Sequence, residues 1–178
     1  MDRDNSTTPH VTHVLREVVD VAWNATEWHL QRGQANHACY AMLARGADFD
    51  ADPLCEPWID GWRKWVNEIQ PEIEEAEVRI VSRLYNYVGT MDLLCIIDDK
   101  ATIVDFKNSV SPLDQYQMAA YAQGYKETEG WEIKQVVGVQ ISGDGGYKMG
   151  KIIKGAELRK ALAGWLAIRE VYRIKKGV

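Results

Sequence analysis

Two stretches in the first half of the chain repeat small or apolar residues at helical spacing. Between Trp23 and Arg45 there is no proline, and four residues share one helical face: Gly33, His37, Ala41 and Ala44. After the turn-rich segment 46–57, a second stripe ends before Pro71 and is wholly apolar: Trp58, Trp62, Trp65 and Ile69. The pattern predicts two helices, with His37 facing whatever the first helix packs on.

After Pro71 the period of the pattern changes to two. Residues 78–82 alternate in the manner of a half-exposed strand, with an arginine at position 79. The segments Val88–Ile97 and Thr102–Lys107 are apolar stretches joined by a short acidic turn. The three segments predict a meander of three strands.

The second half of the chain returns to helix and then mixes both periods. We expect a helix over Leu113–Thr128, a strand over Gln135–Ile141, and a glycine-rich hairpin turn leading into a strand at Tyr147–Ile153. A last helix over Ala156–Arg173 carries an inward apolar face: Leu158, Leu162, Trp165, Ile168 and Tyr172.

These elements predict one α/β domain over residues 1–178, with a central mixed β-sheet flanked by helices. A chain of 178 residues with 46% hydrophobic residues can bury one core and is short for two domains. The first ten residues are polar and contain Pro9, so we expect a loose lead-in. Because no run of about 18 apolar residues and no apolar leader is present, we expect a soluble cytoplasmic protein without membrane partners.

Charge and cysteine content narrow the classes of function. The net charge of −5 argues against a protein that coats nucleic acid by charge alone, because neutralising phosphates takes clustered Lys and Arg. Cys39, Cys55 and Cys95 include no Cys-x-x-Cys pair, so we expect buried thiols rather than a zinc or redox site. A nucleic acid partner would therefore require local basic groups or bound divalent cations.

The predicted strand that ends at Lys107 carries an acid and a lysine on one face. Side chains alternate along a strand, so Asp105 and Lys107 project together, away from the side taken by Phe106. Asp92 lies on the preceding strand, within reach of Asp105. Phosphodiester hydrolysis needs these parts, because carboxylates hold Mg²⁺ or Mn²⁺ and a lysine can orient the attacking water or offset developing charge.

Three short motifs follow one another along the predicted strands and the helix after them. They are Gly89-Thr90-Met91-Asp92, Asp105-Phe106-Lys107 and Gln117-Met118-Ala119-Ala120-Tyr121. In this order of elements they resemble the PD-(D/E)XK nuclease superfamily, in particular its RecB-like branch of phage exonucleases. The resemblance reaches upstream to the histidine motif of that branch, at Arg32-Gly33-Gln34-Ala35-Asn36-His37, and to a glutamate ahead of the first strand, Glu77. It implies a restriction-endonuclease-like αβββαβ core.

The resemblance also implies a role for each matched residue. The implied metal ligands for Mg²⁺ or Mn²⁺ are His37, Asp92, Asp105 and the carbonyl of Phe106. The implied catalytic set is Asp92, Asp105, Lys107, Glu77, Gln117 and Tyr121. In that set Lys107 would serve the attacking water, and Glu77 would reach the metal through water. The implied protein is a metal-dependent deoxyribonuclease, with exonuclease action favoured, in phage-type DNA recombination, replication or repair.

The resemblance extends to partners and cofactors. DNA is the expected substrate, and a second copy of the chain or a recombination protein remains open as a protein partner. Four basic residues near the motif strands are candidates for phosphate contacts: Arg79, Arg83, Lys100 and Lys126. The four cysteines that hold an iron–sulfur cluster in some RecB-like nucleases are absent, so we expect no cluster.

Each of these residues has a plainer interpretation. Asp-x-Lys alone occurs on many solvated strands, and a lone histidine such as His37 on an apolar helical face is more often a core residue. Glu77 belongs to an acidic run that is also typical of a solvated helix end, and Gln117 and Tyr121 could form the edge of an amphipathic helix. The alternative function is a catalytically silent module of the same fold that binds DNA or a protein partner.

Overall fold

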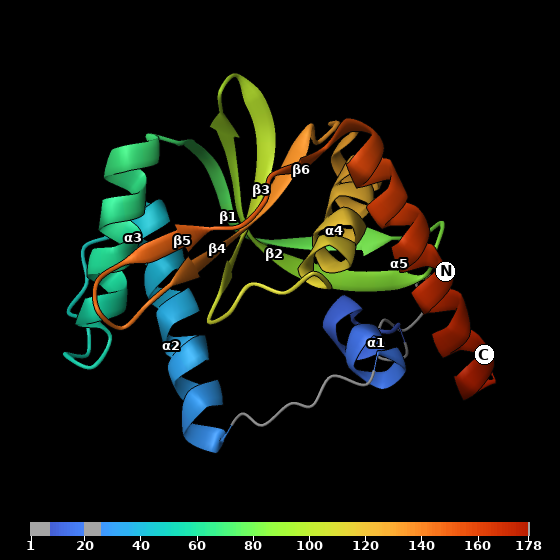
Figure 1. Cartoon of the computed structure of the whole chain (residues 1–178), viewed down its shortest axis with the longest axis horizontal. Helices are drawn as coiled ribbons and strands as arrows, with labels where there is room; N and C mark the ends of the chain where they lie inside the picture. Colours follow the sequence, from blue (N-terminus) through green and yellow to red (C-terminus); the bar gives the residue numbers. More distant parts are fainter. Residues whose placement is uncertain (1–7, 20–25, 178) are drawn as a thin grey trace.

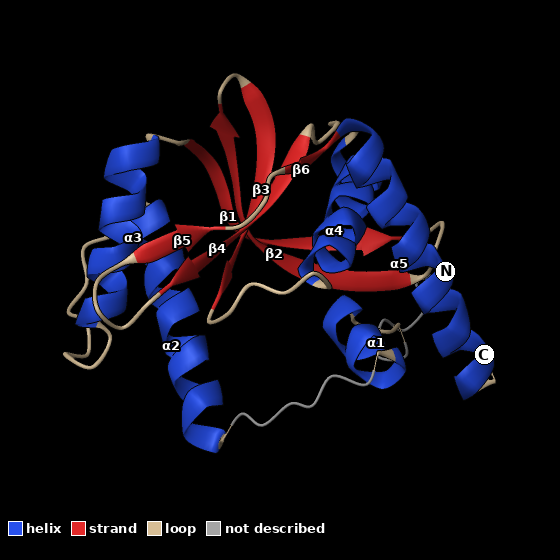
Figure 2. Ribbon diagram, in the orientation of Figure 1, coloured by secondary structure: helices blue, strands red, loops and turns tan. Residues whose placement is uncertain are grey.

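Figures 1 and 2 show the computed structural model, which describes residues 8–19 and 26–177. The elements follow one another in this order: α1 Val11–Val18, α2 Glu27–Ala44, α3 Glu56–Ile69, β1 Glu72–Ser82, β2 Tyr87–Ile97, β3 Lys100–Lys107, α4 Asp114–Glu129, β4 Gln135–Ile141, β5 Tyr147–Met149, β6 Ile153–Lys154 and α5 Gly155–Lys176. The helix, three strands, helix and strand expected from the sequence are therefore present.

The strands form one mixed sheet in the order β1-β2-β3-β4-β5, with β6 paired to β4. The first three strands are an antiparallel meander, and β3 and β4 run parallel because α4 crosses over between them. Helices cover both faces of this sheet: α2 and α3 lie on one side, and α1, α4 and α5 on the other (Figure 1). The prediction of an α/β domain with a central mixed sheet flanked by helices is confirmed.

Each face of the sheet has its own hydrophobic core. On the α2 and α3 side, the buried cluster includes Trp65, Val104 and Phe106. On the other side, the buried cluster includes Ile103 and Trp165, and the apolar face predicted for the last helix packs there. Because successive residues of β3 alternate between these two cores, Asp105 and Lys107 share one face, as the sequence predicts, and α4 covers that face.

The N-terminal part of the described chain is tied to β2. Of the lead-in expected for the first ten residues, residues 1–7 lie outside the described part, and the Pro9 carbonyl accepts a hydrogen bond of 3.1 Å from the Val88 amide. Helix α1 follows, an element that the sequence pattern did not predict, and buries Val11 and Val14 completely. The sequence predicts the next helix from Trp23, which lies outside the described residues, and α2 is described from Glu27.

Two strand predictions differ from the structure in their bounds. The first strand begins at Glu72 rather than near Val78, so the acidic run is a strand edge and not a helix end. Glutamate has a low propensity for strands, so the sequence pattern does not predict a strand in this part of β1. The single strand expected over Tyr147–Ile153 is two short strands, β5 and β6, which are separated by residues 150–152; within this gap the Gly150 amide donates to the Gly138 carbonyl at 2.8 Å.

The cysteines are free thiols in the structure. Cys55 and Cys95 are buried, as the sequence predicts, whereas Cys39 on α2 is half-buried. Within residues 8–19 and 26–177, none of the helices combines the length and the apolar character that crossing a bilayer demands.

Candidate metal centre

The two aspartates of the sequence motifs lie where β2 and β3 separate. The last pair in the β2–β3 ladder is Leu93 with Val104, so the next residues on the two strands are Asp92 and Asp105. Instead of continuing the ladder, the Phe106 amide donates a hydrogen bond of 2.7 Å to Asp92 Oδ2. The separation of the strands leaves both carboxyl groups beside the same gap in the ladder.

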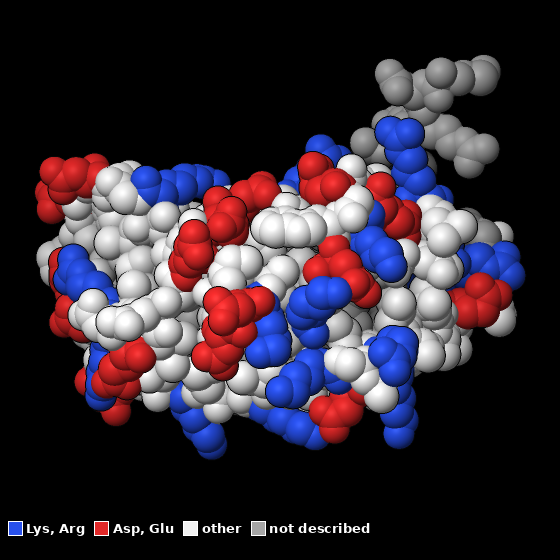
Figure 3. Space-filling view, turned by 90° about the horizontal axis from the view of Figure 1, so that it is seen from above, with Lys and Arg blue, Asp and Glu red and all other residues white. Residues whose placement is uncertain are grey.

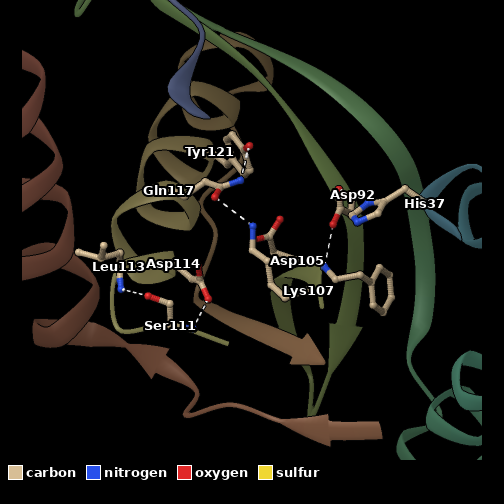
Figure 4. A network of polar contacts seen from close by, with 10 residues as sticks. His37, Asp92, Asp105, Lys107, Ser111, Leu113, Asp114, Gln117 and Tyr121 are labelled. Carbon is tan, nitrogen blue, oxygen red and sulfur yellow. Dashed lines mark hydrogen bonds and ion pairs between the residues drawn. The ribbon is translucent and has the colours of Figure 1, made fainter. Parts of the chain in front are cut away.

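Asp92 is held by one residue of β3 and one of α2. Its Oδ2 accepts from the Phe106 amide, and its Oδ1 lies 3.2 Å from His37 Nδ1 on α2 (Figure 4). Burial raises the pKa of the Asp92 carboxyl, but the charges of His37 and Lys107 and the two contacts outweigh this effect, so its pKa is lowered. For His37, burial alone would lower the imidazole pKa. The charge of Asp92 and the contact with it outweigh burial, so the pKa is raised.

A chain of polar contacts runs from Asp105 to helix α4. Lys107 Nζ lies 2.6 Å from Asp105 Oδ2 and donates to Gln117 Oε1 at 3.0 Å, and Gln117 Nε2 donates to the Tyr121 hydroxyl oxygen at 2.7 Å. Figure 4 shows this chain and the approach of Gln117 and Tyr121 from one face of α4. Gln117 is 8% exposed and Tyr121 1% exposed, so both belong to the buried interior and not to a solvated helix edge.

Burial is the largest influence on the pKa values of Asp105 and Lys107. Desolvation raises the pKa of the Asp105 carboxyl to about 7, with Asp92 adding to the rise and Lys107 opposing it. Burial would lower the pKa of Lys107, but Asp105 and Asp92 outweigh burial and raise it. Lys107 is therefore a protonated ammonium at neutral pH. A positive charge near Asp105 favours the ionised form of its carboxyl group.

Glu77 completes a cluster with His37 and Asp92. The residues on either side of Glu77 pair with Met91 and Leu93, so Glu77 stands opposite Asp92 on the neighbouring strand. Its φ of 54° is in the left-handed region, which is unusual for a non-glycine residue inside a strand. One ligand atom from each of His37, Glu77 and Asp92 lies within 4.8 Å of the others.

The donor set fits a divalent cation. Imidazole nitrogen and carboxylate oxygen are ligands of Mn²⁺, and carboxylate and carbonyl oxygens suit Mg²⁺. Burial raises the pKa of Glu77 and the Asp92 charge raises it further, and together they outweigh the opposing charges of His37 and Arg45. A divalent cation beside Asp92 would oppose this rise and favour the ionised form of Asp105.

Two contacts at the centre involve residues outside the sequence motifs. Tyr40 on α2 is 4% exposed, and its ring centroid lies 5.0 Å from that of Phe106 and 6.0 Å from that of His37. Asp114, the first residue of α4, accepts a hydrogen bond of 2.6 Å from the Ser111 amide and acts electrostatically on Lys107. The spacing of Tyr40 three residues after His37 is a helical-face signal, but its contact with Phe106 depends on packing.

One basic candidate lies away from the centre. Lys100 is the first residue of β3, at the opposite end of the strand from Lys107, and its ammonium binds the Asp98 carbonyl. The position of Lys100 gives no support to a phosphate contact beside the aspartates.

Comparison with known proteins places the fold. No protein-family model matches the sequence, and no curated protein matches it either. The structure is similar to a protein of Eubacterium rectale that bears the name "Putative exonuclease", with a TM-score of 0.51, 13% identity and coverage of 95% of this chain and 75% of that one. An alkaline exonuclease of Laribacter hongkongensis matches with a TM-score of 0.39, 12% identity and coverage of 94% and 90%. At such identities the first likeness shows a shared fold, and the chemistry has to be argued from the residues.

Proposed function

We propose that the protein is a metal-dependent DNA nuclease that hydrolyses phosphodiester bonds. The observation that carries this proposal is the position of Asp92, Asp105 and Lys107 together at the point where β2 and β3 separate. Two carboxylates and one half-buried ammonium form a site suited to a divalent cation and a phosphate group. The exonuclease-like fold agrees with this reaction class.

The proposed metal ligands are Asp92, Asp105, His37 and the Phe106 carbonyl, with Glu77 acting through water. Bound there, Mg²⁺ or Mn²⁺ would supply a Lewis acid for a phosphoryl oxygen and lower the pKa of a water molecule. The Phe106 amide keeps Asp92 ionised and oriented. In the same way, Gln117 and Asp105 hold the Lys107 ammonium from two sides.

The raised pKa of Lys107 defines its part in the reaction. A group that stays protonated at neutral pH does not remove a proton from water. Lys107 therefore acts as a donor that orients the attacking water and offsets the negative charge that develops on the phosphate. Tyr121 takes no direct part in this step and positions Gln117 by accepting its amide hydrogen bond.

The finer assignments rest on the motif order together with this geometry. We assign the chain to the RecB-like branch of the PD-(D/E)XK superfamily, as one nuclease domain acting as an exonuclease in phage-type DNA recombination, replication or repair. The site would then act in the cytoplasm of the host cell. The helical position of His37 opposite Asp92 supports this branch over a generic carboxylate site.

A cleavage assay tests the proposal. End-labelled linear and closed circular DNA, single- and double-stranded, are incubated with the full chain in Mg²⁺, Mn²⁺ or EDTA. We expect metal-dependent loss of linear DNA, and Lys107→Ala should slow it at least about a hundredfold, the effect of removing one donor to developing charge. Lys64→Ala, on the exposed face of α3, is the matched control and should cleave like the wild type. Binding of DNA without cleavage under any of these conditions would replace the nuclease with a catalytically silent binding module.

A further inference from the structure

Helix α2 ends in a turn that fixes the backbone position of Arg45. The Gly46 amide donates to the Leu43 carbonyl at 3.0 Å, and the φ of Gly46 is 66°. The Ala47 amide donates to the Met42 carbonyl at 2.9 Å. This pattern is a Schellman motif, in which a left-handed glycine stops the helix and the last carbonyls find partners. Arg45 is the residue before that glycine, so its side chain starts from a well-defined point.

From this point Arg45 reaches the edge strand of the sheet. Its Nη2 donates a hydrogen bond of 2.8 Å to the carbonyl oxygen of Ala76 on β1. Because β1 lies at the end of the strand order, it is paired with a neighbour on one side only, and some of its backbone carbonyls need partners from elsewhere. The Arg45 guanidinium supplies that partner for Ala76.

The carbonyl of Ala76 directly precedes the irregular residue of β1. Ala76 pairs with Leu93 of β2, whereas the next residue, Glu77, has a φ of 54°. A left-handed φ in a non-glycine residue persists only where surrounding contacts hold it. The Ala76 carbonyl belongs to the planar peptide group that joins Ala76 to Glu77, so its direction helps to determine this φ. The hydrogen bond from Arg45 therefore acts on the backbone of Glu77.

Arg45 and His37 hold α2 at two points, with Glu77 between them. His37 Nδ1 lies 3.2 Å from Asp92 Oδ1 on β2, and Arg45 follows about two helical turns later and binds β1. Glu77 stands opposite Asp92 and forms a cluster with Asp92 and His37. Burial raises the pKa of the Glu77 carboxyl, and the charge of Arg45 opposes this rise. Arg45 thus acts on Glu77 through its charge as well as through the backbone.

Side-chain packing leaves open space where Arg45 crosses from α2 to β1. A hollow of about 330 Å³ lies between the end of α2 and the start of β1, and its lining is Ala44, Arg45, Ile73, Glu74, Glu75 and Ala76. In a close-packed interior, neighbouring side chains fix the distance between two elements, but a hollow lets them shift without overlap. The hydrogen bond of Arg45 spans this corner and limits the shift.

We propose that Arg45 is a positioning residue for the candidate metal centre: by holding the Ala76 carbonyl, it keeps the Glu77 carboxylate beside His37 and Asp92. The inference rests on the proposed function, because it requires a divalent cation at that centre, and it adds a residue that lies outside the three sequence motifs. Arg45 contacts neither the metal nor the substrate and acts through Glu77.

Calorimetric titration of Mn²⁺ into the full chain, without DNA, tests the inference through metal affinity alone. Arg45→Met keeps a long side chain and removes the donors, and we expect it to weaken Mn²⁺ binding on the order of tenfold, the effect of losing a group that orients metal ligands. Arg45→Lys keeps the charge and a donor and should restore most of the affinity. In a Glu77→Gln background, Arg45→Met should cause no further loss, because the two substitutions remove the same contribution.

Arg63→Met is the matched control, because it removes the same charge from α3. Arg63 is exposed and pairs with Asp60 at 3.1 Å. Figure 3 shows acidic and basic side chains interspersed over one face of the protein, and salt in solution limits the range over which such exposed charges act. Arg63→Met should therefore bind Mn²⁺ like the wild type.

The outcomes separate this inference from the proposed function. If the wild type binds Mn²⁺ and cleaves DNA while Arg45→Met binds Mn²⁺ like the wild type, the positioning role is overturned and the nuclease stands. An equal loss of affinity with and without Glu77→Gln would also overturn it, since Arg45 would then act independently of Glu77. If Arg45→Met behaves as expected but no DNA is cleaved, Arg45 still positions a metal centre, in a protein that is not a nuclease. Absence of Mn²⁺ binding to the wild type would overturn both.

Discussion

Gly89 and Tyr121 fit together across the sheet and α4. A Cβ at Gly89 would lie 2.6 Å from Tyr121 Cε1, which is closer than side-chain atoms approach one another. Gly89 precedes Asp92 by three residues on β2, and Tyr121 receives the hydrogen bond from Gln117 that begins the contact chain to Lys107. Gly89, the first residue of the Gly89–Asp92 motif, therefore leaves the space that is filled by the ring of Tyr121, the last residue of the Gln117–Tyr121 motif.

The fit predicts the effect of Gly89→Ala. The added methyl group has to displace the Tyr121 ring, and overpacking of this kind costs about 1–3 kcal/mol of folding free energy. The shift should also loosen Gln117 and Lys107, so cleavage should slow in the folded variant. Thermal unfolding and turnover at a temperature where the variant is folded measure the two effects. Gly33→Ala is the control, because the nearest atom to its Cβ is an ordinary contact at 3.5 Å.

A bound metal should stabilise the fold through the two aspartates. Because a ligand that binds only the folded state adds stability, Mn²⁺ at about a hundred times its dissociation constant should add about 2.7 kcal/mol. Asp105→Asn should lose most of this gain. Differential scanning fluorimetry with a Mn²⁺ titration measures the shift, and Asp98→Asn in the exposed β2–β3 turn serves as the control. An equal shift in Asp105→Asn and the wild type would remove Asp105 from the ligand set.

Without metal, Asp105→Asn should be at least as stable as the wild type. Folding raises the pKa of Asp105 from its ordinary value of 3.8 to about 7, so the folded state binds this proton more tightly than the unfolded state. The stability contributed by that proton is complete below the ordinary pKa and is lost as the pH rises through about 7. In EDTA, Asp105→Asn should therefore match the wild type in acid and exceed its stability above neutral pH. Urea unfolding across this pH range measures the difference, and a variant less stable than the wild type throughout would refute the assignment.

The site could be predicted from sequence wherever one element determines which side chains share a face. The alternation of β3 places Asp105 with Lys107, and the four-residue spacing of Gln117 and Tyr121 places them on one face of α4. The motif position singles out Glu77, but its backbone conformation is not predictable from sequence, because a positive φ is unusual for a non-glycine residue and no spacing along β1 specifies it.

Contacts between elements distant in sequence were beyond the reach of periodicity. The ring of Tyr40 packs between His37 and Phe106 only because α2 packs against that face of the sheet, and no local spacing specifies that contact.

Tyr40 should act as a positioning residue for the metal ligands. Its ring fixes the distance between α2, which carries His37, and β3, which carries Phe106. Tyr40→Leu should lower Mn²⁺ affinity about tenfold, the size of effect found when groups that orient metal ligands are removed. Isothermal titration calorimetry measures the affinity, and Tyr40→Phe should restore it because the ring is kept. A loss of thermal stability in Tyr40→Leu with unchanged Mn²⁺ affinity would show that the ring fills space and nothing more.

The position of a bound Mn²⁺ ion is the most direct test of the candidate metal centre. Anomalous diffraction from crystals of the full chain grown with Mn²⁺ locates the ion without reference to activity. We predict a peak between Asp92 and Asp105, at about 2.1 Å from a carboxylate oxygen of each and from the Phe106 carbonyl oxygen. A peak at other residues, or none between these two aspartates at a Mn²⁺ concentration that saturates binding in solution, would contradict the account.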